Sequence, residues 1–248
     1  MIRKIAFTLI ELLVVIAIIV LLLSILRPSL QKAKSLARIV VCQTNLRQLG
    51  FGLLLYAQDN NNKTLPYISP SLGYYWMQPI SPYLEAKLKQ GDNKDMKVAF
   101  CPEATLLPDC TKLQAYGGSK MAWQMNFGQW KSSYANNGWW FSDLDEAAPN
   151  YFGRSQAYIY RNTLQFKDDT PMFADGLWIT GWADDEAQPP TEPSIVSYSG
   201  FETFWVDRHG TAINVSLGSG SVSRFPIGEL WNLPWRRVWQ KHVYDVRW

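Results

Sequence analysis

Three cysteines and two histidines are the residues of this sequence whose side chains most readily suggest chemistry. Cys101 and Cys110 bracket a short segment with two prolines, which predicts a small disulfide loop if this part of the chain lies outside the cytoplasm. Cys42 stands in a helical pattern, and both a Cys42–Cys101 pairing and three reduced thiols are open alternatives. Because there is no C-x-x-C spacing and the only histidines are His209 and His242, we expect no metal site.

The sequence lacks the short motifs that mark common catalytic sites. It contains no G-x-S-x-G nucleophile elbow and no phosphate-binding loop, so we predict that the protein is not an enzyme. The net charge of +3 is too small to indicate a nucleic-acid partner. Two acidic pairs, Asp143 with Asp145 and Asp184 with Asp185, could offer oxygens to Ca²⁺, but neither has EF-hand spacing. We therefore expect no cofactor.

A single carboxylate, Glu11, interrupts the apolar segment 7–26, which follows a short basic start at residues 1–6. A stretch of roughly 20 apolar residues can span a bilayer as a helix. A secretory signal peptide usually has a shorter apolar region that is followed by a small-residue cleavage site. A plain membrane anchor leaves Glu11 unexplained, because a carboxylate at the bilayer centre costs about 2.5–3.5 kcal/mol.

The residues Ala6-Phe7-Thr8-Leu9-Ile10-Glu11-Leu12-Leu13 resemble the processing site of type IV prepilins and type II secretion pseudopilins. The resemblance implies that a prepilin peptidase removes residues 1–6, cuts between Ala6 and Phe7, and methylates the new amine. Ala6 stands where the family usually has glycine. The resemblance also implies that Glu11 pairs with the Phe7 amine of a neighbouring subunit. Since two charges in apolar surroundings are tolerated only when paired, this contact would fix one axial register during assembly.

The helical pattern continues well beyond the apolar segment. It predicts one helix over residues 7–60, on the order of 80 Å long, with a transmembrane or filament-core part at 7–26 and an amphipathic stalk at 27–60. Pro28 removes one backbone hydrogen bond inside this pattern. A proline often stands here in pilin-type helices; a helix boundary at the membrane surface is the alternative. The apolar stripe of the stalk recurs at spacings of three and four: Leu36, Ile39, Cys42, Leu46, Leu49, Leu53 and Tyr56.

The remaining residues, 61–248, predict a globular head of the α+β class, because strands follow one long helix and do not alternate with helices. We expect an antiparallel sheet packed on the C-terminal half of the stalk, with long irregular loops at 114–150 and 176–199. The expected strands are short β-branched or aromatic runs bounded by turn residues: 97–101, 156–160, 172–174, 204–206, 212–217 and 221–225.

A second motif lies near the carboxyl end, where Asp207-Arg208-His209-Gly210 is followed by Gly218-Ser219-Gly220-Ser221. It resembles a prepilin-like family whose head carries a histidine, nine residues and then Asp-Gly. His209 matches the histidine, Gly220 matches the glycine, and Ser219 stands in place of the aspartate. Gly220 is expected to supply a positive φ in a turn between two strands. His209 is either a structural residue that fixes this hairpin or a site residue, and we expect the structural role.

Together the two resemblances imply a structural subunit of a type IV pilus-like or type II secretion pseudopilus filament. The precursor would lie in the bacterial inner membrane, and the processed protein in a periplasmic or extracellular filament. The implied partners are copies of the chain, the prepilin peptidase and an inner-membrane assembly platform. The alternative is a minor tip pseudopilin whose Trp-rich head binds a carbohydrate or a protein through exposed rings at Trp139, Trp140, Trp178 and Trp182.

Overall fold

The computed structural model describes residues 9–67, 75–84, 96–105, 114–125, 129–143, 158–189, 200–242 and 244. The chain divides into two compact units, Met1–Val40 and Val41–Trp248. A long N-terminal helix and a largely antiparallel sheet place the protein in the predicted α+β class. The predicted processing residues Ala6 and Phe7, and the predicted disulfide partner Cys110, lie outside the described residues.

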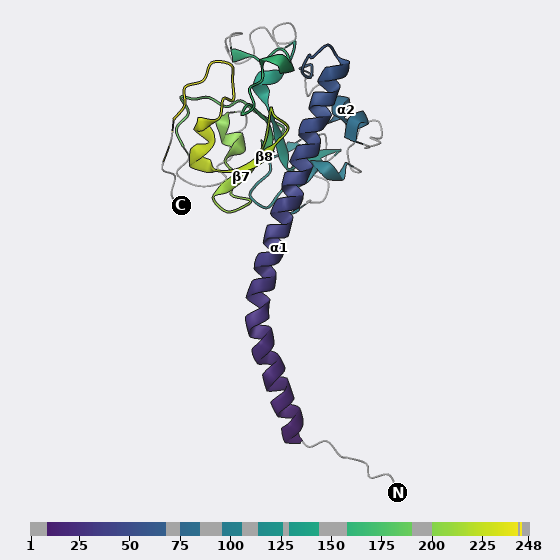
Figure 1. Cartoon of the computed structure of the whole chain (residues 1–248), viewed down its shortest axis with the longest axis vertical. Helices are drawn as coiled ribbons and strands as arrows, with labels where there is room; N and C mark the ends of the chain where they lie inside the picture. Colours follow the sequence, from purple (N-terminus) through teal and green to yellow (C-terminus); the bar gives the residue numbers. More distant parts are fainter. Residues whose placement is uncertain are drawn as a thin grey trace. The chain divides into compact units, whose positions relative to one another are not determined.

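Helix α1 (Leu9–Asp59) has 51 residues and supplies the described part of the first unit (Figure 1). Its N-terminal part is long and apolar enough to cross a membrane, and none of that span is buried within the protein. Pro28 lies inside the helix, which continues to Asp59. The alternative of a helix boundary at this proline is therefore wrong.

In the second unit, residues 41–59 of α1 bury one face. Cys42, Leu46, Leu49 and Leu53 are fully buried, which confirms this part of the predicted stripe, whereas Leu36 in the first unit is exposed. Two glycines let the helix approach its neighbours closely. A Cβ at Gly50 would overlap Ser216 Oγ and Met172 Cε, and a Cβ at Gly52 would lie 2.9 Å from Leu84 Cδ2.

The helix ends in a left-handed turn made by two asparagines. Asn61 and Asn62 have φ values of 56° and 62°, and Asn62 N donates a hydrogen bond to Ala57 O at 2.7 Å. Asparagine tolerates this conformation better than most residues, which makes it a helix-stop signal. The predicted end of the helix near residue 60 is therefore confirmed to within one residue.

The second unit contains two sheets. The larger has the order β6-β4-β5-β7-β8 and is antiparallel except between β4 and β6; the smaller, β1-β2-β3, is antiparallel throughout. The strands are β1 (Gln114–Ala115), β2 (Trp123–Met125), β3 (Trp130–Ser132), β4 (Tyr134–Asn137), β5 (Pro171–Asp175), β6 (Thr180–Gly181), β7 (Ala212–Leu217) and β8 (Val222–Pro226). The short helices are α2 (Met77–Ile80), η2 (Ser81–Leu84), η3 (Lys97–Ala99), η4 (Gly138–Trp140), η7 (Thr163–Gln165), η8 (Phe201–Phe204) and η9 (Ile227–Asn232).

The larger sheet separates two aromatic-rich cores. One contains the buried face of α1 with Met172 and Phe173 of β5; the other contains Ile213 and Val215 of β7 with η8 and η9. Because side chains alternate along a strand, Asn214 and Ser216 of β7 point to the face that α1 covers. Both are fully buried. The sheet therefore presents polar groups to the helix inside the protein.

Several predicted strands need correction. Residues 97–99 form the 3-10 helix η3, residue 204 ends η8, and residues 158–160 carry no strand. Strands β5 and β7 contain the predicted runs 172–174 and 212–217, and β8 is displaced by one residue from 221–225. The region 114–150, expected to be irregular, contains β1 to β4, and β6 lies within 176–199.

Candidate functional site

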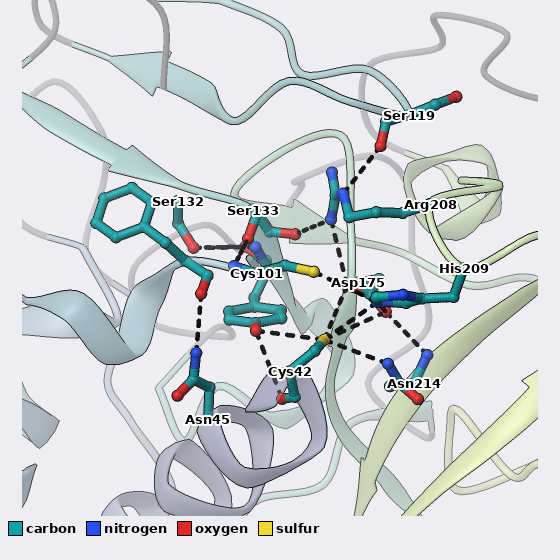
Figure 2. Close-up of polar contacts among 12 residues, drawn as sticks. Cys42, Asn45, Cys101, Ser119, Ser132, Ser133, Asp175, Arg208, His209 and Asn214 are labelled. Atoms are coloured by element: carbon teal, nitrogen blue, oxygen red, sulfur yellow. Dashed lines mark hydrogen bonds and ion pairs between the residues drawn. The ribbon is translucent and has the colours of Figure 1, made fainter. Parts of the chain in front are cut away.

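Four chemically distinctive side chains meet inside the second unit: Cys42, Cys101, Asp175 and His209 (Figure 2). One possible ligand atom from each lies within 4.8 Å of all the others. Cys42, Cys101 and Asp175 are at most 1% exposed, and His209 is 5% exposed. We call these residues the CCDH cluster. Each comes from a different part of the chain: α1, the residues after η3, the end of β5 and the segment before β7.

His209 Nε2 lies at the centre of the CCDH cluster. It is 3.3 Å from Cys42 Sγ, 3.3 Å from Cys101 Sγ and 3.4 Å from Asp175 Oδ2. Cys42 Sγ is 3.5 Å from Asp175 Oδ1. Two thiols, one imidazole and one carboxylate therefore gather around His209 Nε2, with one ligand atom of each within 4.8 Å of the others.

A shell of hydrogen-bond donors surrounds the cluster. Arg208 Nη1 forms a fully buried ion pair with Asp175 Oδ1 at 3.2 Å. Asn214 makes two contacts: its backbone N–H donates to Asp175 Oδ2 at 2.9 Å, and its side-chain Nδ2 donates to Cys42 Sγ at 3.2 Å. Tyr134 Oη also donates to Cys42 Sγ, at 3.4 Å. The carboxylate and one sulfur are thus both approached by donors from the protein.

Backbone contacts hold the members of the cluster in place. Cys101 N donates to Ser133 Oγ, and the carbonyl of Ala99 accepts bonds from Ser132 Oγ and Ser133 N. Arg208 donates to the carbonyl of Ser133 at 2.7 Å, as well as to those of Ser119 and Gly118. These hydrogen bonds hold the segments that carry Cys101 and Arg208 in place, because buried polar groups need hydrogen-bond partners.

The buried charges shift the ionisation of the cluster in defined directions. Burial favours the neutral form of Asp175, but the hydrogen bond and charge of His209, with Arg208, lower its pKa. Burial opposes the charging of His209, whereas Asp175 and Cys101 raise its pKa to about 9. The two thiols differ. Burial and Asp175 raise the pKa of Cys42; burial acts the same way on Cys101, but hydrogen bonds from Cys42 and His209 lower its pKa to about 6.

Comparison with known proteins does not extend this description. No family model, curated protein or solved structure matches this chain. The geometry of the described residues therefore carries the argument about this site.

Sequence reasoning found parts of the cluster but did not bring them together. Cys42 and Cys101 are both buried free thiols in this structure, so the alternative disulfide between them is not formed. The predicted pairing of Cys101 with Cys110 stays a prediction, because Cys110 lies outside the described residues. His209 is a hydrogen-bonded residue before the β7–β8 hairpin, as expected, yet it also touches two sulfurs. The sequence does not predict Asp175 as a site residue, and Arg208 enters only as part of the motif around His209. Their positions are far apart in the chain, and no local spacing indicates that they meet.

The other predicted site residues lie elsewhere. Glu11 is exposed in the first turn of α1. Gly220 has a φ of +79°, which confirms the expected left-handed residue in the turn between β7 and β8. Its N–H donates to Leu217 O at 2.8 Å, and Leu217 N donates to Ser221 O at 2.9 Å. The turn therefore forms with Ser219 in place of an aspartate.

Asp143, Asp184, Asp185 and the loop tryptophans contact the rest of the head, whereas Asp145 lies outside the described residues. Asp185 and Asp184 form ion pairs with Arg236, and Asp143 accepts a hydrogen bond from Tyr67 N. The rings proposed for ligand stacking point inward: Trp139, Trp140 and Trp182 are buried and Trp178 is half-buried. Trp139, Trp140 and Trp182 therefore belong to the core, and Trp178 packs against it with one contact to the ring of Tyr116.

Proposed function

We propose that this protein is a structural subunit of a pilin-like filament, held in a membrane by the N-terminal part of α1 before assembly. The observation that carries the proposal is the exposed apolar surface of the first unit. Along the span from Leu9 to Leu26, the leucine, isoleucine and valine side chains are 46–78% exposed. Soluble monomers rarely expose continuous apolar surface of this extent, so lipid or other chains must cover it.

Exposed apolar side chains also recur, among basic residues, past the length that a bilayer can cover. Residues 9–40 of α1 would measure about 48 Å at 1.5 Å per residue, whereas a hydrocarbon core is about 30 Å thick. Beyond Leu26, Leu30, Leu36 and Val40 are each more than half exposed. Lipid alone leaves part of this surface in water, which favours side-by-side packing of several such helices.

The type IV prepilin-like motif at Ala6–Leu13 supplies the processing step of the proposal. Removal of residues 1–6 would place a cationic amine on Phe7, close in sequence to Glu11. In a bundle of parallel helices, the Glu11 carboxylate of one subunit would pair with the Phe7 amine of the next. Such a pair favours the register in which both charges are neutralised, because an unpaired charge is costly in apolar surroundings.

The test compares Glu11→Gln with Glu186→Gln, an exposed carboxylate of the head, in cells that express the full chain. We expect Glu11→Gln to lower the amount of chain in the sheared-filament fraction at least about 10-fold, an effect of about 1.4 kcal/mol, while its amount in the membrane stays unchanged. Glu186→Gln should assemble normally. Mass analysis of the sheared fraction should show a methylated Phe7 at the N-terminus. A chain that keeps residues 1–6 and never enters a polymer contradicts the proposal.

A further inference from the structure

The filament proposal makes no use of the CCDH cluster. We propose that Cys42, Cys101, Asp175 and His209 bind one Zn²⁺ ion as a structural site inside the head. The inference is independent of assembly, because every residue involved lies in the second unit. It also replaces the expectation of no metal site, which was based only on spacing in the sequence.

The donor set and its geometry suit zinc. Structural zinc sites use four ligands drawn from cysteine, histidine and carboxylate groups. A tetrahedron with the usual zinc–ligand lengths of about 2.0–2.3 Å has edges of about 3.3–3.8 Å between ligand atoms. His209 Nε2 lies 3.3–3.4 Å from Cys42 Sγ, Cys101 Sγ and Asp175 Oδ2, and Cys42 Sγ lies 3.9 Å from the same carboxylate oxygen. The side chains therefore already stand close to the distances that a central ion would impose.

The donors around the Cys42 sulfur suit a metal-bound thiolate. Asn214 Nδ2 and Tyr134 Oη both direct donor hydrogens at its sulfur. A neutral thiol is a weak acceptor, whereas a metal-bound thiolate is a strong one. Asp175 is oriented in the same way, by Arg208 and by the backbone N–H of Asn214. Outer hydrogen bonds of this kind hold ligands in position at metal sites.

The buried charges balance when the ion is present. Two thiolates and the Asp175 carboxylate carry three negative charges, and Zn²⁺ with Arg208 supplies three positive charges. Zinc binding requires both cysteines as thiolates and a neutral His209, so every proton that these three groups still hold is released to solvent. His209 coordinates through Nε2, and its Nδ1 is buried without a hydrogen-bond partner among the described residues. With four protein ligands the site is closed, which indicates a structural role.

The consequence is a cross-link between α1, the segment after η3, the end of β5 and the segment before β7. A disulfide between Cys42 and Cys101 would join only the first two of these. A disulfide would not account for the positions of His209 and Asp175 beside the two sulfur atoms. Zinc coordination and a Cys42–Cys101 disulfide are mutually exclusive, because each uses both sulfur atoms. The proposal can therefore be tested on the unmodified chain.

The first experiment measures metal in the full chain, purified in detergent without chelator. We expect one equivalent of zinc per chain by elemental mass analysis. After chelation under reducing conditions, added Co²⁺ should give the visible bands of a tetrahedral ion and a thiolate-to-cobalt charge-transfer band. A chain that carries no zinc above the buffer blank and gives no cobalt spectrum overturns the proposal. So does an unreduced mass lower by two hydrogens with Cys42 linked to Cys101.

Variants with matched controls locate the site. Cys42→Ser and His209→Asn should lose the charge-transfer band or the tetrahedral spectrum, while Cys110→Ser and His242→Asn should keep both. Asn214→Ala, which alters only an outer contact, should weaken zinc affinity about 10–100-fold. Equal spectra in all five variants contradict the assignment. Where a ligand variant does not fold, the wild-type chain decides: zinc should protect Cys42 and Cys101 from alkylation, and chelation should expose them.

Discussion

The two halves of helix α1 have opposite surroundings. From Leu9 to Leu26 its apolar side chains are exposed around the helix, whereas from Cys42 to Ala57 a single apolar face is buried against the head. The second half finds its partners in β5, β7 and the aromatic core of the same chain. The first half has an apolar surface that none of the described residues covers. Similar residues in one continuous helix are therefore exposed in one half and buried against the same chain in the other.

The largest expected effect concerns the buried charge that the second half helps to enclose. Asp175→Asn removes the partner of Arg208, which would be left as an uncompensated buried cation. We expect the free energy of unfolding of the metal-free chain in detergent to fall by about 3–5 kcal/mol, as measured by denaturant titration in excess chelator. Asp169→Asn is the control, because its ion pair with Lys241 is about half exposed and should contribute about 0–1 kcal/mol.

The second prediction tests the two halves with the same substitution. Leu49 is fully buried and Leu22 is 54% exposed. Leu49→Ala should destabilise the head by about 2–5 kcal/mol, because it removes buried contacts and leaves a cavity. Leu22→Ala should change the stability of the head by less than about 0.5 kcal/mol. If both variants lower the stability of the head equally in thermal or denaturant unfolding, the contrast between a buried and an exposed half of the helix is wrong.

The smallest effect is expected at the β7–β8 turn. Gly220→Ala places a Cβ on a residue with a φ of +79°, which should cost about 1–2 kcal/mol. Ser219→Ala, at the neighbouring position where the related motif carries an aspartate, should cost less. Denaturant midpoints of the two variants give the comparison. A greater loss at Ser219 would show that side-chain bonding, and not backbone conformation, maintains the turn.

The sequence predicts the parts of the fold that are determined locally. Helix α1 is long and strongly periodic, and the β7–β8 hairpin joins two β-branched or aromatic runs through a glycine, so both could be identified. Strands β2 and β3 have three residues each, too short for a period-2 pattern to emerge. Strand β4 contains Asn136 and Asn137, which are unfavourable in strands. Asn137 is retained because its side chain donates to the carbonyls of Pro171 and Trp235.

The candidate site could not be predicted because its residues meet only through tertiary contacts. Cys42 and His209 are separated by 167 positions, and Cys42 and Asp175 by 133. The incorrect strand at 97–101 has the same cause. Its apolar residues suggested a buried strand, but the carbonyl of Ala99 is used by Ser132 and Ser133 from another segment. Hydrogen bonds from a distant segment therefore favour the 3-10 helix η3 at residues 97–99 over a strand.

Gly50 and Gly52 have a consequence for the order of events during folding. Each glycine inside a helix costs about 0.5–1 kcal/mol relative to alanine, so residues 41–59 form a helix poorly by themselves. This part of the helix is stabilised when β5 and β7 have formed, because Met172 and Ser216 of these strands pack closely against Gly50. The apolar first half needs no such template in a bilayer. If the first half inserts into lipid, that step does not depend on the head, whereas residues 41–59 depend on strands that are synthesised more than a hundred residues later.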